Sequence, residues 1–310
     1  MKILSFRDHK GTDAVGALLA DDTVADLTPL IPNFTATGAS PIRQLLHATG
    51  GHLPFTDTDL ANCERHPLAS LDIAPLVPDP TKVIAAPVNY RDHQAEMMED
   101  YHIDALGVFL KAPSSVIGHG DTVGLPYTDR RFDQEGELAL VIGRTTRNVP
   151  VDKALDVVAG YTCLLDITMR GGEDRSTRKS FDTFTPVGPY LVTADEVGPL
   201  AQLQLRTRVN GTLRQDADIA DLIWGVPELI SYTSSVMTLH PGDIVTTGTP
   251  AGIGQIDDGD TVSVDIDRIG TLTVAVSTAG AVPCPTKGAS RGPKPPEEIT
   301  PVRHRAPARA

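Results

Sequence analysis

The chain has 310 residues, of which 40% are hydrophobic and 22% charged, a composition typical of a globular protein with a sizeable core. Its formal net charge of −13 argues against nucleic acid or an anionic membrane as a partner. The first residues, MKILSFRDHK, contain no long apolar run, and no segment is long enough to span a membrane, so we expect a cytoplasmic protein without a signal peptide.

Residues 1–75 are expected to form a small N-terminal α+β module. Three short strand patterns precede one helix pattern: Lys2–Arg7, Val15–Leu19, Thr23–Asp26 and then Pro41–Ala48. The proline-rich stretch 74–80 (APLVPDP) has the composition of a linker. We read no chemistry from this module.

Residues 76–280 are expected to form the second, larger unit. It contains many short apolar strand patterns separated by Gly, Pro and Asp turns, with few helical patterns: Asp92–Glu99, Val151–Asp156 and Val226–Met237. Strands do not alternate regularly with helices, which argues against a doubly wound α/β sheet. The expected fold class is strand-rich α+β.

The last stretch, residues 281–310, is expected to be a disordered tail, because it is rich in Pro, Lys and Arg and poor in large apolar residues. An inert extension is favoured over a tail that binds an acidic partner. The three cysteines (Cys63, Cys163 and Cys284) are widely spaced and odd in number, so we expect reduced, structural thiols.

Three carboxylates are the most informative residues. Glu135 and Glu137 flank the start of a buried strand pattern at 136–143 (GELALVIG), and residues two apart on a strand share a face. Asp166 ends a second apolar pattern at 157–166. Three buried like charges need a cation, and oxygen ligands alone suit Mg²⁺, Mn²⁺ or Ca²⁺. For the glutamate pair taken alone, a solvated strand edge is the favoured alternative.

His93 and Glu96 form a second constellation. A short helix at this point would place both side chains on one face. A carboxylate on one imidazole nitrogen raises the basicity of the other, which makes a general base for water. Taken alone, this spacing is more often a solvated surface pair.

Together these stretches resemble the fumarylacetoacetate hydrolase family, in particular its acylpyruvate hydrolases and the 2-hydroxyhepta-2,4-diene-1,7-dioate isomerase-like group. The matching motifs follow the family's order between about residues 82 and 275: NYRDHQAE (89–96), FLKAPSSVIG (109–118), DQEGELALVIG (133–143), GYTCLLDIT (160–168), RKSFDTFTPVGP (178–189), VNGTLRQ (209–215) and GDIVTTGTPAGIG (242–254). The resemblance implies a mixed β-sheet roll, partly an open barrel, with the site at its mouth. It also implies a homodimer, in which the stretch 221–230 around Trp224 belongs either to the interface or to the core.

The resemblance also implies roles for single residues. Glu135, Glu137 and Asp166 would hold one divalent cation, Mg²⁺ or Mn²⁺ before Ca²⁺. The implied catalytic residues are His93 and Glu96, on a helix that acts as a lid, and Lys179. The implied substrate-binding residues are Tyr90, Arg91, Glu173, Thr247 and Gly248. A surface lysine and an ordinary strand threonine are the alternatives for Lys179 and Thr247.

Glu173 departs from the family's pattern. Many relatives carry Arg-Asp-Leu-Gln after the aspartate ligand, with the glutamine on the substrate, whereas this chain has Arg170-Gly171-Gly172-Glu173. A glutamate adds negative charge beside an anionic substrate. Glu173 therefore points away, pairs with an arginine such as Arg170 or Arg175, or serves a different substrate.

The implied function is metal-dependent hydrolysis of a C–C bond in a β-diketo acid of the acylpyruvate or fumarylpyruvate type, in aromatic or sugar-acid catabolism. His93, oriented by Glu96, would activate water, and Lys179 would stabilise the oxyanion. Decarboxylation of oxaloacetate, or isomerisation of a hydroxymuconate-type substrate, on the same metal site is the main alternative. The intact dyad favours hydrolysis. A keto-acid-binding protein without catalysis, or a scaffold that recruits a partner through its tail, is a minor alternative.

Overall fold

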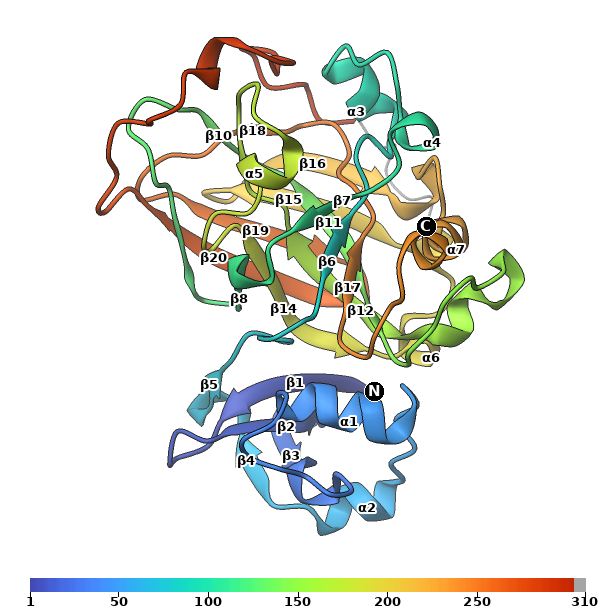
Figure 1. Cartoon of the computed structure of the whole chain (residues 1–310). Coiled ribbons are helices and arrows are strands. Elements are labelled where there is room, and N and C mark those ends of the chain that lie inside the picture. Colours follow the sequence, from blue (N-terminus) through green and yellow to red (C-terminus); the bar gives the residue numbers. More distant parts are fainter. Residues whose placement is uncertain (304–310) are drawn as a thin grey trace, which may run out of the picture.

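Short strands make up most of the regular structure. The structure is a computed structural model that describes residues 1–303, and in that part of the chain twenty strands form three sheets. Helices are short and lie around the sheets (Figure 1). The predicted strand-rich α+β class is confirmed. Each sheet has two ends in its strand order, so none of the three closes on itself.

The largest sheet has twelve strands, drawn from both of the predicted units, residues 1–75 and 76–280. Its path is β4-β3-β2-β1-β14-β12-β11-β17-β6-β7, with β5 beside β1 and β8 beside β14. The bounds are β1 Lys2–Arg7, β2 Asp13–Leu18, β3 Thr23–Asp26, β4 Arg65–Pro67, β5 Asp72–Ile73, β6 Val83–Ala85, β7 Phe109–Lys111, β8 Val116–Ile117, β11 Gly136–Ile142, β12 Val158–Leu165, β14 Thr185–Val192 and β17 Ile244–Thr246.

Two smaller sheets complete the larger unit. The five-stranded sheet has the order β16-β15-β19-β20-β9, and the three-stranded sheet has the order β13-β10-β18. Their bounds are β9 Thr122–Gly124, β10 Phe132–Gln134, β13 Thr168–Met169, β15 Gln204–Val209, β16 Thr212–Asp218, β18 Gly254–Gln255, β19 Thr261–Ile266 and β20 Gly270–Ser277.

The N-terminal strands are joined to the main sheet by backbone hydrogen bonds. β1 pairs antiparallel with β14, in the register Lys2↔Val192, while β1–β5 and their two helices lie together at one end of the molecule (Figure 1). The helices there are α1 (Pro41–Thr49), whose buried residues include Ile42, Leu45 and Leu46, and α2 (Asp57–Asn62). The division of the chain at residues 75 and 280 stays a prediction.

The helices of the larger unit are α3 (Arg91–Glu96), α4 (Ile103–Leu106), α5 (Arg175–Arg178), α6 (Ala194–Val197) and α7 (Val226–Val236). The helix predicted over Asp92–Glu99 ends early, because Met98 adopts a left-handed φ of 51° that an α-helix does not allow. The helix predicted at Val151–Asp156 is a 3₁₀ helix, Val151–Val157. No helix among the described residues is long and apolar enough to cross a membrane.

Strand β11 lies at the centre of the core. All seven of its residues are buried, because hydrophobic clusters cover both of its faces. Leu138, Leu140 and Ile142 pack into one cluster, while Ala139 and Val141 pack into the other. A strand covered on both faces gives a continuous apolar run in the sequence. The acidic residues at its start are therefore held at the edge of a dry core.

The C-terminal segment has defined contacts over its described part, residues 281–303. Gly172 N–H donates to the Gly288 carbonyl at 3.0 Å, and the Arg131 guanidinium donates to the Pro296 carbonyl at 3.3 Å. Arg303 forms ion pairs with Asp218 and Asp221 at 3.1 and 2.7 Å. The predicted disordered tail also includes residues 304–310, which lie outside the described residues.

Candidate active site

Three carboxylates converge where strands β11 and β12 end side by side. The antiparallel register sets Gly136 opposite Leu165, and Asp166 N–H donates to the Glu135 carbonyl at 2.8 Å. Carboxylate oxygens of Glu135, Glu137 and Asp166 lie within 4.8 Å of one another, and all three residues are buried. The strand register thus brings together the three residues that the sequence selects.

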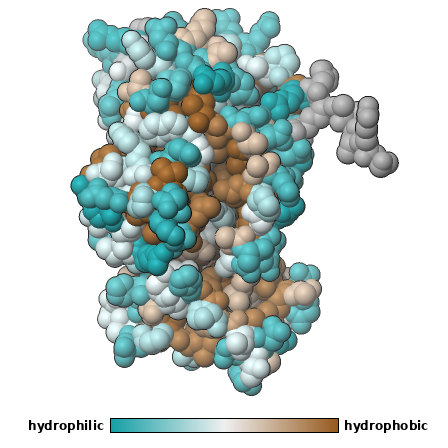
Figure 2. All heavy atoms as spheres, turned by 90° about the vertical axis from the view of Figure 1, so that its right-hand side faces the viewer, coloured by the Kyte–Doolittle hydropathy of each residue, from teal (hydrophilic) through white to brown (hydrophobic). Residues whose placement is uncertain are grey.

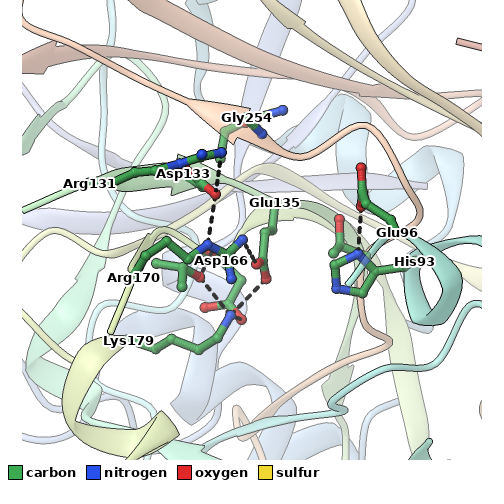
Figure 3. Close-up of polar contacts among 12 residues, drawn as sticks. His93, Glu96, Arg131, Asp133, Glu135, Asp166, Arg170, Lys179 and Gly254 are labelled. Atoms are coloured by element: carbon green, nitrogen blue, oxygen red, sulfur yellow. Dashed lines mark hydrogen bonds and ion pairs between the residues drawn. The ribbon is translucent and has the colours of Figure 1, made fainter. Parts of the chain in front are cut away.

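Protein cations compensate two of these three carboxylates. Lys179 Nζ lies 2.7 Å from Glu135 Oε2 and 2.5 Å from Asp166 Oδ2, and Arg170 donates to Glu135 Oε1 at 2.7 Å (Figure 3). Lys111, fully buried, forms an ion pair with the other oxygen of Asp166 and donates to the Phe184 carbonyl at 2.9 Å. Burial raises the pKa of Glu135, but Lys179 and Arg170 outweigh it and hold that pKa well below its usual value.

Glu137 is the carboxylate with too little positive charge around it. Burial, followed by the charge of Asp166, raises its pKa to about 8. Its Oε2 accepts hydrogen bonds from Gly248 N–H at 2.9 Å and from the Thr246 hydroxyl, both uncharged donors. An all-oxygen set with a buried, undercompensated carboxylate is a donor set that fits Mg²⁺ or Mn²⁺. The three residues can therefore hold one divalent cation.

His93 and Glu96 form a hydrogen-bonded pair across the pocket from Lys179 (Figure 3). His93 Nδ1 lies 2.9 Å from Glu96 Oε2, and the other oxygen of Glu96 accepts from Gly252 N–H at 2.8 Å. Helix α3 supplies the i,i+3 spacing, and the glycine-rich loop after β17 fixes the carboxylate. His93 is buried yet lines the pocket, so its Nε2 side is available for a proton from a bound water.

One pocket joins all of these groups. It is lined by the three carboxylates, by His93, Lys179, Arg170, Arg175 and Arg178, and by Ala86, Pro87, Val88, Met97, Glu99, Phe109, Thr249 and Pro293. Two arginines in this set belong to α5, which Lys179 follows directly. The residues 97–102 that connect α3 to α4 include the exposed side chains of Met98 and Tyr101. The role of α3 as a lid stays a prediction.

The predicted substrate-binding residues do not all lie in the pocket. Gly248 lies at the carboxylates and has a φ of +87°, and a Cβ there would approach Ala86 O and Asn89 Cβ to 3.0 Å. Thr247 is fully buried and bonds the Leu138 carbonyl at 3.0 Å, whereas Thr249 lies on the pocket wall.

The other three predicted substrate residues lie away from the pocket wall. Tyr90 is fully buried, and its hydroxyl has no hydrogen-bond partner among the described residues. Arg91 is exposed, beside Asp221 on another surface. Glu173 forms an ion pair at 2.7 Å with Arg130, which comes from the loop before β10. An arginine partner was one of the alternatives, although Arg130 was not among the candidates.

The sequence interpretation missed four residues of this region: Lys111, Arg170, Arg178 and Thr249. Lys111 and Thr249 stood within recognised motifs but were given no role. Arg170 was considered only as a partner of Glu173, and Arg178 immediately precedes Lys179. For Lys111 the available signal was a lysine between apolar residues of a recognised motif, since such residues are rarely buried without a partner.

The site and the open sheets define a class of metal-binding, strand-rich enzymes with a His–Glu pair beside three carboxylates. The profile described as fumarylacetoacetate (FAA) hydrolase C-terminal matches residues 82–277, and the chain belongs to that family.

Three relatives are similar over most of their length. The maleylpyruvate hydrolase of Aquipseudomonas alcaligenes is 41% identical over 291 residues, covering 89% of this chain and 99% of the relative. The crystal structure of maleylpyruvate hydrolase from Sphingobium sp. SYK-6 in complex with manganese(II) and pyruvate is 37% identical, with a TM-score of 0.77, and covers 92% of this chain and 100% of that one. The crystal structure of a 5-carboxymethyl-2-hydroxymuconate delta-isomerase from Mycobacterium smegmatis is 31% identical, with a TM-score of 0.71. The match covers 89% of this chain and 99% of that one.

Proposed function

We propose that this protein is a divalent-metal-dependent hydrolase that cleaves a C–C bond in an acylpyruvate-type β-diketo acid. The observation that carries the proposal is that His93, held by Glu96, lines the same pocket as Glu135, Glu137 and Asp166. The 41% identity to a maleylpyruvate hydrolase and the manganese(II)–pyruvate complex of a structural relative support it.

Each group has a role in the proposed mechanism. Glu135, Glu137 and Asp166 would hold Mg²⁺ or Mn²⁺, which supplies Lewis-acid polarisation of the keto acid when bound. His93 takes a proton from water, and the water oxygen adds to the distal acyl carbonyl. Lys179 stabilises the negative charge that develops there by its own positive charge, since its three N–H groups already donate to Glu135, Asp166 and Thr168. The C–C bond then breaks, its electron pair passes to the pyruvate methylene carbon, and this carbon takes up a proton.

Glu96 acts through His93 in this mechanism. Since its second oxygen is held by Gly252 N–H, the carboxylate fixes the orientation of the imidazole and stabilises the imidazolium that forms. Both oxygens of Glu96 are thus engaged by groups of the protein. Glu96 is therefore a positioning residue, and His93 is the catalytic base.

The proposal includes a compartment and an assembly. A cytoplasmic location is supported by the net charge of −13 and by three free cysteines. A homodimer is supported by exposed apolar side chains on α7 (Tyr232 and Val236) and on the adjacent 3₁₀ helix (Val151 and Leu155). Figure 2 shows apolar residues gathered on the face over these elements.

The test is turnover of an acylpyruvate panel with Mg²⁺, with Mn²⁺ and with EDTA. Loss of the enol absorbance should require metal and should yield equimolar pyruvate and free acid. Activity confined to oxaloacetate, or ketonisation or isomerisation without cleavage, would move the assignment to a decarboxylase or an isomerase, as the 31% identical muconate isomerase allows. Ligand binding without any turnover would indicate a keto-acid-binding protein.

A further inference from the structure

Most cations that line the pocket have a carboxylate partner. Arg170 pairs with Asp133 and Glu135, each at 2.7 Å, and Lys179 pairs with Glu135 and Asp166. Arg175 lies 3.5 Å from Glu99, a longer contact. These side chains are accounted for by charges of the protein itself.

Arg178 is the exception. It is the last residue of α5 and is 9% exposed, and its buried Nε has no hydrogen-bond partner. Neither a hydrogen bond nor an ion pair of this guanidinium occurs within residues 1–303. Burial, followed by the charge of Arg170, lowers its pKa. Because a buried charge without a partner is costly, this guanidinium is prepared for an anion that the protein does not supply.

The position of Arg178 separates this anion from the metal site. Arg178 lines the same pocket as Glu135 and Asp166, and both carboxylates are close enough to act on it electrostatically. Neither carboxylate forms a hydrogen bond with it, since both are occupied by Lys179, Lys111 and Arg170. An anion bound to Arg178 would therefore lie in the same pocket as the metal site. It would be held by the Arg178 guanidinium and not by the metal.

The charge of the pocket indicates what this anion is. Four cationic side chains and four carboxylates line it, with His93 in addition. A divalent cation would leave two positive charges in excess, and a ligand with two carboxylates would neutralise them. The planar guanidinium fork matches a carboxylate in two parallel hydrogen bonds.

We propose that Arg178 binds a second carboxylate at the acyl end of the substrate, so that the site selects keto diacids over keto monoacids. The inference rests on the proposed function for the identity of the reacting end. It deepens that function by assigning one residue, Arg178, to the recognition of a terminal carboxylate. Arg178 is then a specificity-determining residue.

A binding measurement tests this without turnover. Calorimetry in the presence of Mn²⁺ would compare 2-oxoheptanedioate with 2-oxoheptanoate, which have the same chain length and lack the second keto group required for cleavage. The wild type should bind the diacid about 30-fold or more tightly, since loss of one partner of a buried charge pair has at least this effect. Equal affinities would overturn the inference, and this comparison needs no variant.

Variants then assign the preference to a residue. Arg178→Gln should reduce the diacid preference to about 3-fold or less with monoacid affinity unchanged, and Arg178→Lys should retain part of it, since it keeps the charge but loses the fork. The matched control is Arg147→Gln, which removes an exposed guanidinium outside the pocket. An equal loss of affinity for both ligands in Arg178→Gln would overturn the inference.

Kinetics separate this inference from the proposed function. Hydrolysis of maleylpyruvate and acetylpyruvate by the wild type tests the function, and the ratio of their kcat/KM values in Arg178→Gln tests the residue. A wild type that selects the diacid ligand but hydrolyses neither substrate would refute the function and leave Arg178 as a diacid receptor. A wild type that hydrolyses both with equal kcat/KM would refute the inference and leave the function.

Discussion

The backbone N–H of Asp166 donates to the backbone carbonyl of Glu135 at 2.8 Å, immediately beyond the paired ends of β12 and β11. This hydrogen bond fixes two carboxylates from separate strands on one side of the sheet. Their position therefore depends on the register of two strands that are buried apart from Val158, and not on a flexible loop. A rigid donor set of this kind is suited to a cation that tolerates little change in geometry.

The first prediction concerns the proposed base. His93→Ala should lower kcat by about 10²- to 10⁴-fold, the usual contribution of a positioned general base, because no other imidazole lines the pocket among the described residues. Mn²⁺ affinity, measured by titration with electron paramagnetic resonance detection, should stay within about 3-fold of the wild type, since the oxygen ligands are intact. Unimpaired turnover by this variant would refute the assignment of His93 as the base.

The second prediction concerns Lys111, which pairs with Asp166 in the interior. Lys111→Met should destabilise the metal-free protein by about 3–5 kcal/mol, because it leaves a buried carboxylate with one partner fewer. Saturating Mn²⁺ should recover part of the loss by supplying positive charge. Urea unfolding with and without Mn²⁺ measures both effects. The control is Lys153→Met, at an exposed lysine. An equal loss of unfolding free energy in both variants would contradict the prediction.

The third prediction uses pH. Hydrogen bonds from Arg130 and Thr286, with the charge of Arg130, outweigh burial and lower the pKa of Glu173 to about 2. A carboxyl whose folded-state pKa is depressed stabilises the fold above its ordinary pKa, near 4.5, and this contribution is lost as the pH falls towards 2.

Glu173→Gln should therefore unfold at a lower temperature than the wild type at pH 7, and the difference should shrink steadily below about pH 4.5. Thermal unfolding of both proteins across this range measures it. Asp174→Asn is a nearby control, because this exposed carboxylate caps α5 and has no part in the Arg130 cluster. A difference that stays constant down to pH 2 would show that Glu173 acts by packing alone.

The fourth prediction concerns the C-terminal segment. It lies beyond residue 277, where the family match ends, yet Pro293 lines the pocket and Gly288 bonds Gly172. Deletion of residues 281–310 should raise KM several-fold, because the loop that precedes α5 loses its contacts on one side. The control is deletion of residues 304–310 alone. Undiminished turnover and unchanged KM in the longer deletion would show that the segment has no part in the chemistry.

Local spacing, together with the resemblance to a known family, made much of the site predictable. Glu135 and Glu137 share a face because a strand repeats every two residues, and His93 reaches Glu96 because a helix brings residues three apart together. The same periodicities predicted the bounds of β1 and β3 exactly as the structure has them. These features need only the backbone geometry of one element.

Pairings between distant parts of the chain were not predictable in this way. The Arg130–Glu173 pair, the burial of Lys111 against Asp166, and the contact of residues 281–303 with the body each join segments far apart in the sequence. The hydrophobic pattern of the sequence does not predict which distant residue an arginine or glutamate in a loop will pair with. The helix predicted over Asp92–Glu99 also includes Met98. The left-handed backbone conformation of Met98 could not be predicted from its residue type.

The sequence by itself determined the strand-rich class, because short apolar runs act within single elements, and its ordered family motifs selected the three carboxylates and the His–Glu pair. Only the tertiary structure decided that Glu173 turns to Arg130, that Thr249 and not Thr247 lines the pocket, and that Arg178 is buried without a partner. The physical reason is that charge pairing and desolvation depend on which segments meet after folding.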